Sequence, residues 1–398
     1  MRILHFADLQ LGVETYGRPN GKTGLNTRVE DFLRVLDTVI DHALGCGVDL
    51  VLFCGDAFEY KTPTMTVQRE FASRVKRLSD GGVPTILVVG NHDLPAAMGK
   101  AHTVEIFRTL DVPGVIIADK PGTHIVETKS GPAQVVTIPW PLTSHLLTRE
   151  DVKGMNPEEI NELIADVIGK CIKEEAAKLN PDHVSILAAH LAVFGGSYGS
   201  QRSVMLGSEV VLPLDSVSLP QFDYVALGHL HRYQVLKDSP PVIYSGSLER
   251  VDFGEETEEK GFIVVDIDSS TQIQFVPLNA RRFLTIDVSV EGADPTAQVL
   301  EEIGKHNLEE TVIRLIIRGD EETALGLREG EIQQALAGAH YVAPIIKDTR
   351  RTTRLRLGDR PYEEMTPLEL LETYLQSIGT VPERIEVLAR AAEELMAA

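Results

Sequence analysis

The sequence is poor in cysteine and has no long apolar run. Its three cysteines (Cys46, Cys54 and Cys171) are an odd number without paired spacing, which argues against a disulfide framework or a zinc knuckle and favours a reducing cytoplasm. No apolar run approaches the roughly 20 residues that a membrane-spanning helix needs. The stretch before Asp8 is too short for a signal peptide. We therefore expect a cytoplasmic protein without a membrane segment.

Basic residues are also scarce. The chain has 38 lysines and arginines and 59 acidic residues, which give a net charge of −21. Phosphate neutralisation drives the affinity of most nucleic-acid binders, so this charge excludes strong electrostatic DNA binding over the whole surface. The chain could act on nucleic acid through bound divalent cations, local basic patches or a partner that holds the DNA. It could equally act on small phosphoesters.

The 398 residues contain no internal repeat and are enough for two or three domains. Apolar runs alternate with stretches of helical spacing that end at glycines. This order predicts an α/β fold whose strands carry ligands at their carboxyl ends. The main expected strands are 3–7, 48–54, 83–89, 184–189, 224–227 and 242–244, and the expected helices are 29–45, 66–78 and 157–179.

Polar side chains that can bind metals follow five of these strands. They are Asp8, Gln10, Asp56, Asn91, His92, Asp93, His190, His229 and His231. Each motif alone is more often structural, but together they predict one rim of metal ligands. Carboxylate, amide and imidazole groups suit manganese, iron, zinc or magnesium better than copper. Two such ions about 3.5–4 Å apart can clamp a phosphodiester and generate a hydroxide nucleophile, so we predict a two-metal phosphoesterase.

These motifs resemble, in their order along the chain, the signature of calcineurin-like metallophosphoesterases. The pattern consists of Asp8, Gly55-Asp56, Gly90-Asn91-His92-Asp93, a lone His190 and Gly228-His229-Leu230-His231. Further motifs resemble the SbcD family, the bacterial form of the Mre-type double-strand-break repair nuclease. They are Tyr244-Ser245-Gly246-Ser247-Leu248-Glu249-Arg250, Asp252-Phe253-Gly254-Glu255 and Lys260-Gly261-Phe262.

The resemblance implies a β-sandwich flanked by helices and a role for each motif residue. One metal would be held by Asp8, Gln10, Asp56 and His231, and the second by Asp56, Asn91, His190 and His229, with Asp56 bridging. His92 would be the catalytic imidazole, oriented by Asp93, and would stabilise the transition state or protonate the leaving 3′ oxygen. The resemblance further implies two divalent ions, with manganese preferred, in a 3′–5′ exonuclease and endonuclease.

The sequence departs from this family at Gln10, where relatives usually have histidine. A glutamine oxygen is a neutral and weaker ligand than imidazole, so we expect weaker binding of the first metal, or water in place of this ligand. Glu59 stands three residues after Asp56, where relatives often carry Asp or His, and its role stays open.

The C-terminal third changes character and predicts further domains. We expect a nuclease domain over residues 1–280, a small α+β capping domain over 281–358 and a helix-loop-helix over 361–398, with strands that include 341–346. Thr366-Pro367-Leu368-Glu369 is a capping box that starts the first tail helix. The basic residues of this part could be either a charged strand edge or a phosphate-binding patch, and the sequence favours neither interpretation. They are Lys347, Arg350, Arg351, Arg354, Arg356 and Arg360.

Three functions are compatible with these patterns. The first is a DNA nuclease of an SbcCD-type repair complex, in which the tail helices dock an SbcC-type coiled-coil ABC ATPase and a homodimer acts on DNA ends and hairpins. The second is a phosphodiesterase or phosphatase for small molecules, which the acidic charge would suit. The third is a catalytically weak structural adaptor of the ATPase. The motif around 245–250 and the C-terminal domains favour the nuclease.

Overall fold

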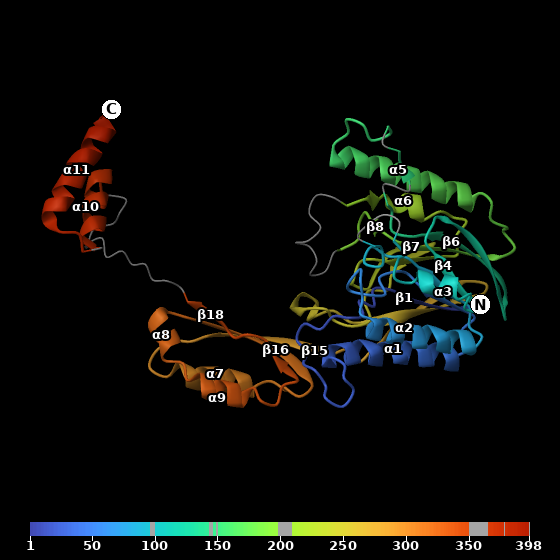
Figure 1. Ribbon diagram of the computed structural model, residues 1–398, viewed down its shortest axis with the longest axis horizontal. Coiled ribbons are helices and arrows are strands. Elements are labelled where there is room, and N and C mark those ends of the chain that lie inside the picture. The colour runs from blue at the N-terminus through green and yellow to red at the C-terminus, as the bar shows by residue number, and fades with distance from the viewer. Residues whose placement is uncertain are drawn as a thin grey trace. The chain divides into compact units, whose positions relative to one another are not determined.

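The computed structural model describes residues 1–95, 100–142, 146–148, 150–197, 209–349, 365–377 and 379–397 (Figure 1). The chain divides into two compact units. The first contains Met1–Ile286, His306–Leu315 and Leu336–Ile345, and the second contains Asp287–Lys305, Ile316–Ala335 and Ile346–Ala398. None of the described helices is both long and apolar enough to cross a membrane.

Two six-stranded sheets form the body of the first unit. The first sheet has the order β14-β13-β1-β2-β3-β4 and the second has the order β11-β12-β10-β7-β6-β5. The strands of the first are β1 (Arg2–Phe6), β2 (Leu50–Phe53), β3 (Thr85–Val88), β4 (Val115–Ala118), β13 (Gly261–Ile267) and β14 (Thr271–Pro277). Those of the second are β5 (Gly122–Thr128), β6 (Gly131–Ile138), β7 (Val184–His190), β10 (Tyr224–Gly228), β11 (Gln234–Asp238) and β12 (Pro241–Tyr244).

Helices cover the outer faces of this sandwich, as Figure 1 shows for α1 and α2 on one side and α5 on the other. A buried apolar cluster that includes Leu52 and Ile86 of the first sheet and Ile186 and Ala226 of the second fills the space between the sheets. Two more clusters join each sheet to its helices. The helices are α1 (Thr27–Gly45), α2 (Met65–Asp80), α3 (Glu105–Thr109), α5 (Pro157–Ala176) and α6 (Leu214–Val217). The predicted β-sandwich flanked by helices is confirmed.

Parallel pairing sets the strand ends that matter for the site. Strands β1, β2, β3 and β4 run parallel, with Phe6 opposite Phe53 and Phe53 opposite Leu87. In the second sheet β6, β7, β10 and β12 are parallel, and His190 lies opposite Gly228. Because parallel strands end at the same edge of a sheet, the polar residues that follow them are brought together. Two short strands, β8 (Ala192–Val193) and β9 (Val211–Leu212), pair with each other in parallel, and β8 follows β7 directly along the chain.

The C-terminal third adds a small sheet and a helical hairpin. The sheet has β16 (Thr311–Gly319) between β15 (Arg282–Ser289) and the short strands, and the division between the units passes through β15 and β16. The other elements are α7 (Pro295–Gly304), α8 (Glu321–Leu325), α9 (Glu329–Ala335), β17 (Tyr341–Val342), β18 (Ile346–Thr349), α10 (Pro367–Ser377) and α11 (Pro382–Ala397). The predicted domain boundaries 1–280, 281–358 and 361–398 stay a prediction.

One strand of this part was predicted wrongly. The run 341–346 forms two strands, β17 and β18, which both pair parallel with β16. Pro344 lies between them and has no N–H to donate to a ladder.

The predicted capping box at Thr366 is confirmed, because Thr366 N donates to Glu369 Oε2 (2.7 Å). Of the basic cluster, Lys347 pairs with Glu329, while residues 350–364 lie outside the described part of the chain.

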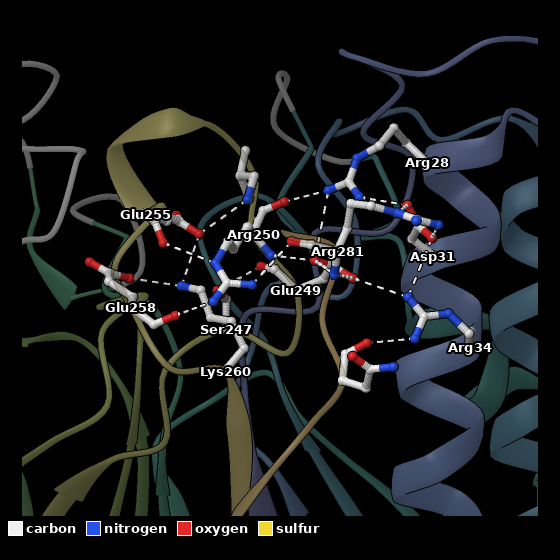
Figure 2. A network of polar contacts seen from close by, with 12 residues as sticks. Arg28, Asp31, Arg34, Ser247, Glu249, Arg250, Glu255, Glu258, Lys260 and Arg281 are labelled. Atoms are coloured by element: carbon white, nitrogen blue, oxygen red, sulfur yellow. Dashed lines mark hydrogen bonds and ion pairs between the residues drawn. The ribbon is translucent and has the colours of Figure 1, made fainter. Parts of the chain in front are cut away.

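A buried ion network ties helix α1 to the segment that leaves the sandwich (Figure 2). Arg28 is fully buried and donates to the carboxylate of Asp31 (2.7 Å), which also accepts from Arg281 Nε (2.9 Å). Arg281 N donates to both oxygens of buried Glu249 (2.9 Å each). Asp31 thus balances two buried guanidinium groups at once.

We expect Asp31→Ala to lower the free energy of unfolding by up to about 3–5 kcal/mol, because it removes the carboxylate that two buried arginines share. Of the ion pairs among the described residues, Arg281 would retain only that with Glu310, and Arg28 only a 3.9 Å contact with Glu249. Urea denaturation measures the loss.

Asp37→Ala is the matched control, since Asp37 also lies on α1 and pairs with Arg74 and Arg77 but has a side chain that is 35% exposed. Its loss should cost about 1 kcal/mol or less. Equal losses for the two variants would contradict this assignment.

Candidate metal centre

The loops after three central strands hold their residues in a rarely populated backbone conformation. Asp8, Gln10, Asp56 and His229 all have positive φ, at 51°, 49°, 60° and 104°. Non-glycine residues in such conformations cost about 1–3 kcal/mol each and cluster at functional sites. The surrounding structure holds them there to aim side chains at a common point.

The centre of the site is a group of three buried residues from three different strand ends. Ligand atoms of Asp8, Asp56 and His190 all lie within 4.8 Å of one another. Two carboxylates and an imidazole at this spacing can hold a divalent ion. A buried oxygen beside them, Gln10 Oε1, has no hydrogen-bond partner among the described residues. This set of donors fits a bound metal.

The His190 side of the site is oriented by neutral groups. His190 Nδ1 lies 2.7 Å from the carbonyl oxygen of Cys54, and its Nε2 lies 2.9 Å from Asn91 Oδ1. Burial lowers the pKa of His190 in spite of the nearby charges of Asp56 and Asp8. A neutral imidazole with its proton on Nδ1 presents Nε2 to a metal. His229 Nδ1 lies 3.2 Å from the same Asn91 oxygen.

Hydrogen bonds join neighbouring strand ends at this rim, both between the two sheets and within the first sheet. The carboxylate of Asp8 accepts from His229 N (3.1 and 3.0 Å), and Gln10 Nε2 donates to Asp56 Oδ2 (2.9 Å). Two glycines are required by close approach. A Cβ at Gly55 would lie 2.2 Å from His190 Nδ1, and one at Gly90 would lie 2.1 Å from Asp56 Oδ1.

His231 is held by a carboxylate. Its Nδ1 lies 2.8 Å from Glu255 Oε1, and both side chains are almost fully buried. Burial alone would lower the pKa of His231, but the charge and hydrogen bond of Glu255, with the charge of Asp8, raise it to about 9. Metal binding at His231 must therefore displace a proton.

The Asp93 side chain has other partners than the predicted one, the ring of His92. The Asp93 carboxylate accepts from Asp56 N (3.0 Å), Gly90 N (3.0 Å), Ala57 N (3.1 Å) and Thr103 Oγ1 (3.0 Å). The His92 ring is oriented by another residue, since its Nδ1 lies 2.7 Å from the Glu59 carbonyl oxygen. The structure thus gives Asp93 the task of tying two strand ends together and gives the orienting task to the backbone of Glu59.

Comparison with known proteins places this rim in a family. Residues 1–233, more than half of the chain, match the model of the calcineurin-like phosphoesterase family. The chain belongs to this family. It is 27% identical over 282 residues to the SbcD subunit of the nuclease SbcCD from Bacillus subtilis, covering 67% of this chain and 66% of that protein, just under two thirds of its length.

Two further relatives of this calcineurin-like chain are similar to it over comparable lengths. The DNA double-strand break repair protein Mre11 of Archaeoglobus fulgidus is 23% identical over 339 residues, which cover 80% of this chain and 69% of that protein. The SbcD subunit of the nuclease SbcCD from Escherichia coli is 26% identical over 261 residues, which cover 64% of this chain and 62% of that protein. The predicted resemblance to the SbcD and Mre-type families is confirmed.

Three residues of this calcineurin-like site were not assigned a role from the sequence. Glu255 lies in a motif that was recognised but not explained. Trp140 follows β6 closely, and its ring lies 4.8 Å from that of His229 and 6.0 Å from that of His190. Glu209 has a side chain that is only 8% exposed and forms an ion pair with His229 Nε2. Nothing in the local pattern points to Glu209, because its partner lies on another segment of the chain.

We expect Gly55→Ala to weaken divalent metal binding by about 10–100-fold, the usual effect of disturbing the groups that orient a ligand. The added Cβ would displace the His190 ring and its hydrogen bond to Cys54. Calorimetric titration with Mn²⁺ measures the loss. Gly82→Ala is the control, because Gly82 also has a positive φ (66°) but a Cβ there would meet nothing within 4 Å. Normal binding by Gly55→Ala would contradict the proposed part of His190 in the centre.

Proposed function

We propose that the protein is a manganese-dependent DNA nuclease, an exonuclease and endonuclease of the SbcCD type. The observation that supports this most strongly is the buried group Asp8, Asp56 and His190 with His92 beside it. The names of the bacterial and archaeal relatives, a nuclease subunit and a DNA-repair protein, support the same substrate class.

The residues of the rim divide between two ions. Asp8, Gln10, Asp56 and His231 would hold the first, and Asp56, Asn91, His190 and His229 would hold the second. When bound there, two divalent ions would supply positive charge next to a phosphodiester and a water molecule of lowered pKa. The protein's part is to fix these donors in place. Their backbones are locked by the contacts among Asp8, His229, Cys54 and His190.

In this proposal His92 would act on the leaving group. Its backbone N donates to Asp56 Oδ1 (2.9 Å), and its ring is anchored through Nδ1. With Nδ1 used, Nε2 is the nitrogen that would face a substrate. Burial would lower the pKa of His92, but the charges of Asp56 and Glu59 and the bond to the Glu59 carbonyl raise it above its ordinary value. A raised pKa favours the protonated ring, the form that would protonate the leaving 3′ oxygen.

The acidic composition makes partners part of the proposal. With a net charge of −21, the chain alone attracts DNA only weakly. An SbcC-type ATPase would therefore bind the DNA. The helical hairpin of α10 and α11 is the expected docking element for this partner. A homodimer, a cytoplasmic location and activity on DNA ends and hairpins belong to the same proposal.

We expect His92→Ala to reduce DNA degradation by about 100–10,000-fold, the range for losing a general acid, while two Mn²⁺ ions still bind by calorimetry. The assay follows Mn²⁺-dependent release of nucleotides from DNA ends, with and without the ATPase partner. His183→Ala, a histidine on the loop before β7, serves as the control and should keep full activity. Unchanged degradation by His92→Ala would instead support the structural adaptor.

The same assay distinguishes a DNA nuclease from a phosphodiesterase for small molecules. A chromogenic small phosphodiester is offered in parallel with DNA at matched concentrations. The nuclease proposal expects kcat/KM for DNA ends to be far higher than for the small diester. A preference for the small diester would overturn the DNA substrate while keeping the phosphoesterase.

We expect Gln10→His to raise the affinity of the weaker metal site by about tenfold or more, because imidazole is a stronger donor than an amide oxygen to borderline ions. In the structure Gln10 Oε1 is buried without a hydrogen-bond partner among the described residues, and the amide is poised beside Asp56. Calorimetry with Mn²⁺ on both proteins measures the change. Equally tight binding of two ions by the native chain would show that Gln10 weakens nothing.

A further inference from the structure

We propose that Glu255, held by Lys260, is a positioning residue that fixes His231 for metal binding. This inference rests on the proposed function, since it concerns the ion that Gln10 and His231 would share. It also gives a role to the motifs at 252–255 and 260–262, which the chemistry of the rim leaves unexplained.

The first support is the way in which the two oxygens of Glu255 are used. Oε1 lies 2.8 Å from His231 Nδ1, while Oε2 accepts from Val251 N (3.1 Å) and lies 2.9 Å from Lys260 Nζ. The Glu255 and Lys260 side chains are 1% and 0% exposed. Figure 2 shows Lys260 between the carboxylates of Glu255 and Glu258. A carboxylate held on both oxygens in this way has one orientation and presents it to the imidazole.

The second support is that the same segment also fixes the main chain of His231. The His231 carbonyl oxygen accepts from Ser247 N (3.0 Å) and from Lys260 Nζ (3.0 Å). Lys260 therefore touches both the backbone of His231 and the carboxylate that orients its ring. Backbone and ring are held by a single buried cluster, so a change in the cluster is transmitted to the position of Nε2.

The third support is the contrast between the two sides of the site. On the second-metal side His190 donates Nδ1–H to a neutral carbonyl, that of Cys54. On the first-metal side His231 faces a carboxylate. A carboxylate on Nδ1 keeps the proton there, directs Nε2 to the metal and makes the imidazole a stronger donor. Among the ligands proposed for the first ion, His231 is the one imidazole, so its donor strength would affect how tightly that ion is held.

The test compares three variants in the full-length chain. Glu255→Ala removes the acceptor and the charge, whereas Glu255→Gln keeps an oxygen that can accept from Nδ1–H. Glu258→Gln is the matched control, because the Glu258 carboxylate also bonds Lys260 Nζ (2.8 Å) whereas the His231 imidazole bonds Glu255. Mn²⁺ is titrated by calorimetry at pH 8, the thermal unfolding of the metal-free proteins is recorded, and the His231 ring nitrogens of the Zn²⁺-loaded proteins are observed by ¹⁵N NMR.

We expect Glu255→Ala to weaken one of the two Mn²⁺ sites by about 10–100-fold and to leave the other within about twofold. Glu255→Gln should recover part of this loss, and Glu258→Gln should bind like the native protein. In the NMR spectrum the native protein should show a protonated Nδ1 and a metal-bound Nε2 for His231, and Glu255→Ala should lose the protected Nδ1 proton.

Two results would overturn the inference while leaving the proposed function intact. One is native two-site binding by Glu255→Ala with an unchanged His231 signal. The other is an equal loss of affinity and of thermal stability in the Glu255 and Glu258 variants, which would mean that the cluster only supports the fold. If the native protein bound no Mn²⁺ at all, the proposed function itself would fail as well, so the two failures are distinguishable.

Discussion

The centre depends on one buried carboxylate, that of Asp93, which four neighbouring donors hold in place. It accepts from the backbone of Asp56 and Ala57 after β2, from Gly90 after β3 and from the hydroxyl of Thr103. Burial and the nearby charge of Asp56 raise the pKa of Asp93 to about 7, and the donors around it oppose this shift. The four hydrogen bonds join two strand ends and hold Asp56 at its positive φ. Without these bonds the Asp56 carboxylate would have no fixed position.

The meeting of Asp8, Asp56 and His190 at one edge could be predicted from the sequence because it follows from local rules. Short apolar runs end in glycine and then in Asp, Asn or His, and parallel strands present such residues at one edge. The tasks within Gly90-Asn91-His92-Asp93 could not be assigned in this way. The acceptor for the His92 ring is the carbonyl of Glu59, and Asp93 bonds residues 36 and 37 positions earlier in the chain. Such pairings are created by the packing of β2 beside β3, which no local pattern encodes.

The same limit explains the other residues whose roles were not foreseen. Glu255, Trp140 and Glu209 each touch a histidine of the rim from a distant segment. Nothing in the sequence near these residues marks them, because their contacts form only in the folded structure. The misplaced strand at 341–346 has a local cause, because apolar spacing predicted a strand through Pro344 and the missing N–H divides it. Helical spacing and a capping box, by contrast, were sufficient to predict α10, where the signal lies within one turn.

The two histidines that we propose for different ions, His190 and His231, are oriented by different kinds of acceptor. Burial lowers the pKa of His190, whose Nδ1 meets a backbone carbonyl, whereas Glu255 raises that of His231 to about 9. A more basic imidazole donates more strongly to a metal but must first give up its proton. In the proposed ligand set, this more basic imidazole lies on the same side as the glutamine amide of Gln10. The buried Lys260 balances the charge of Glu255, while Glu255 orients His231.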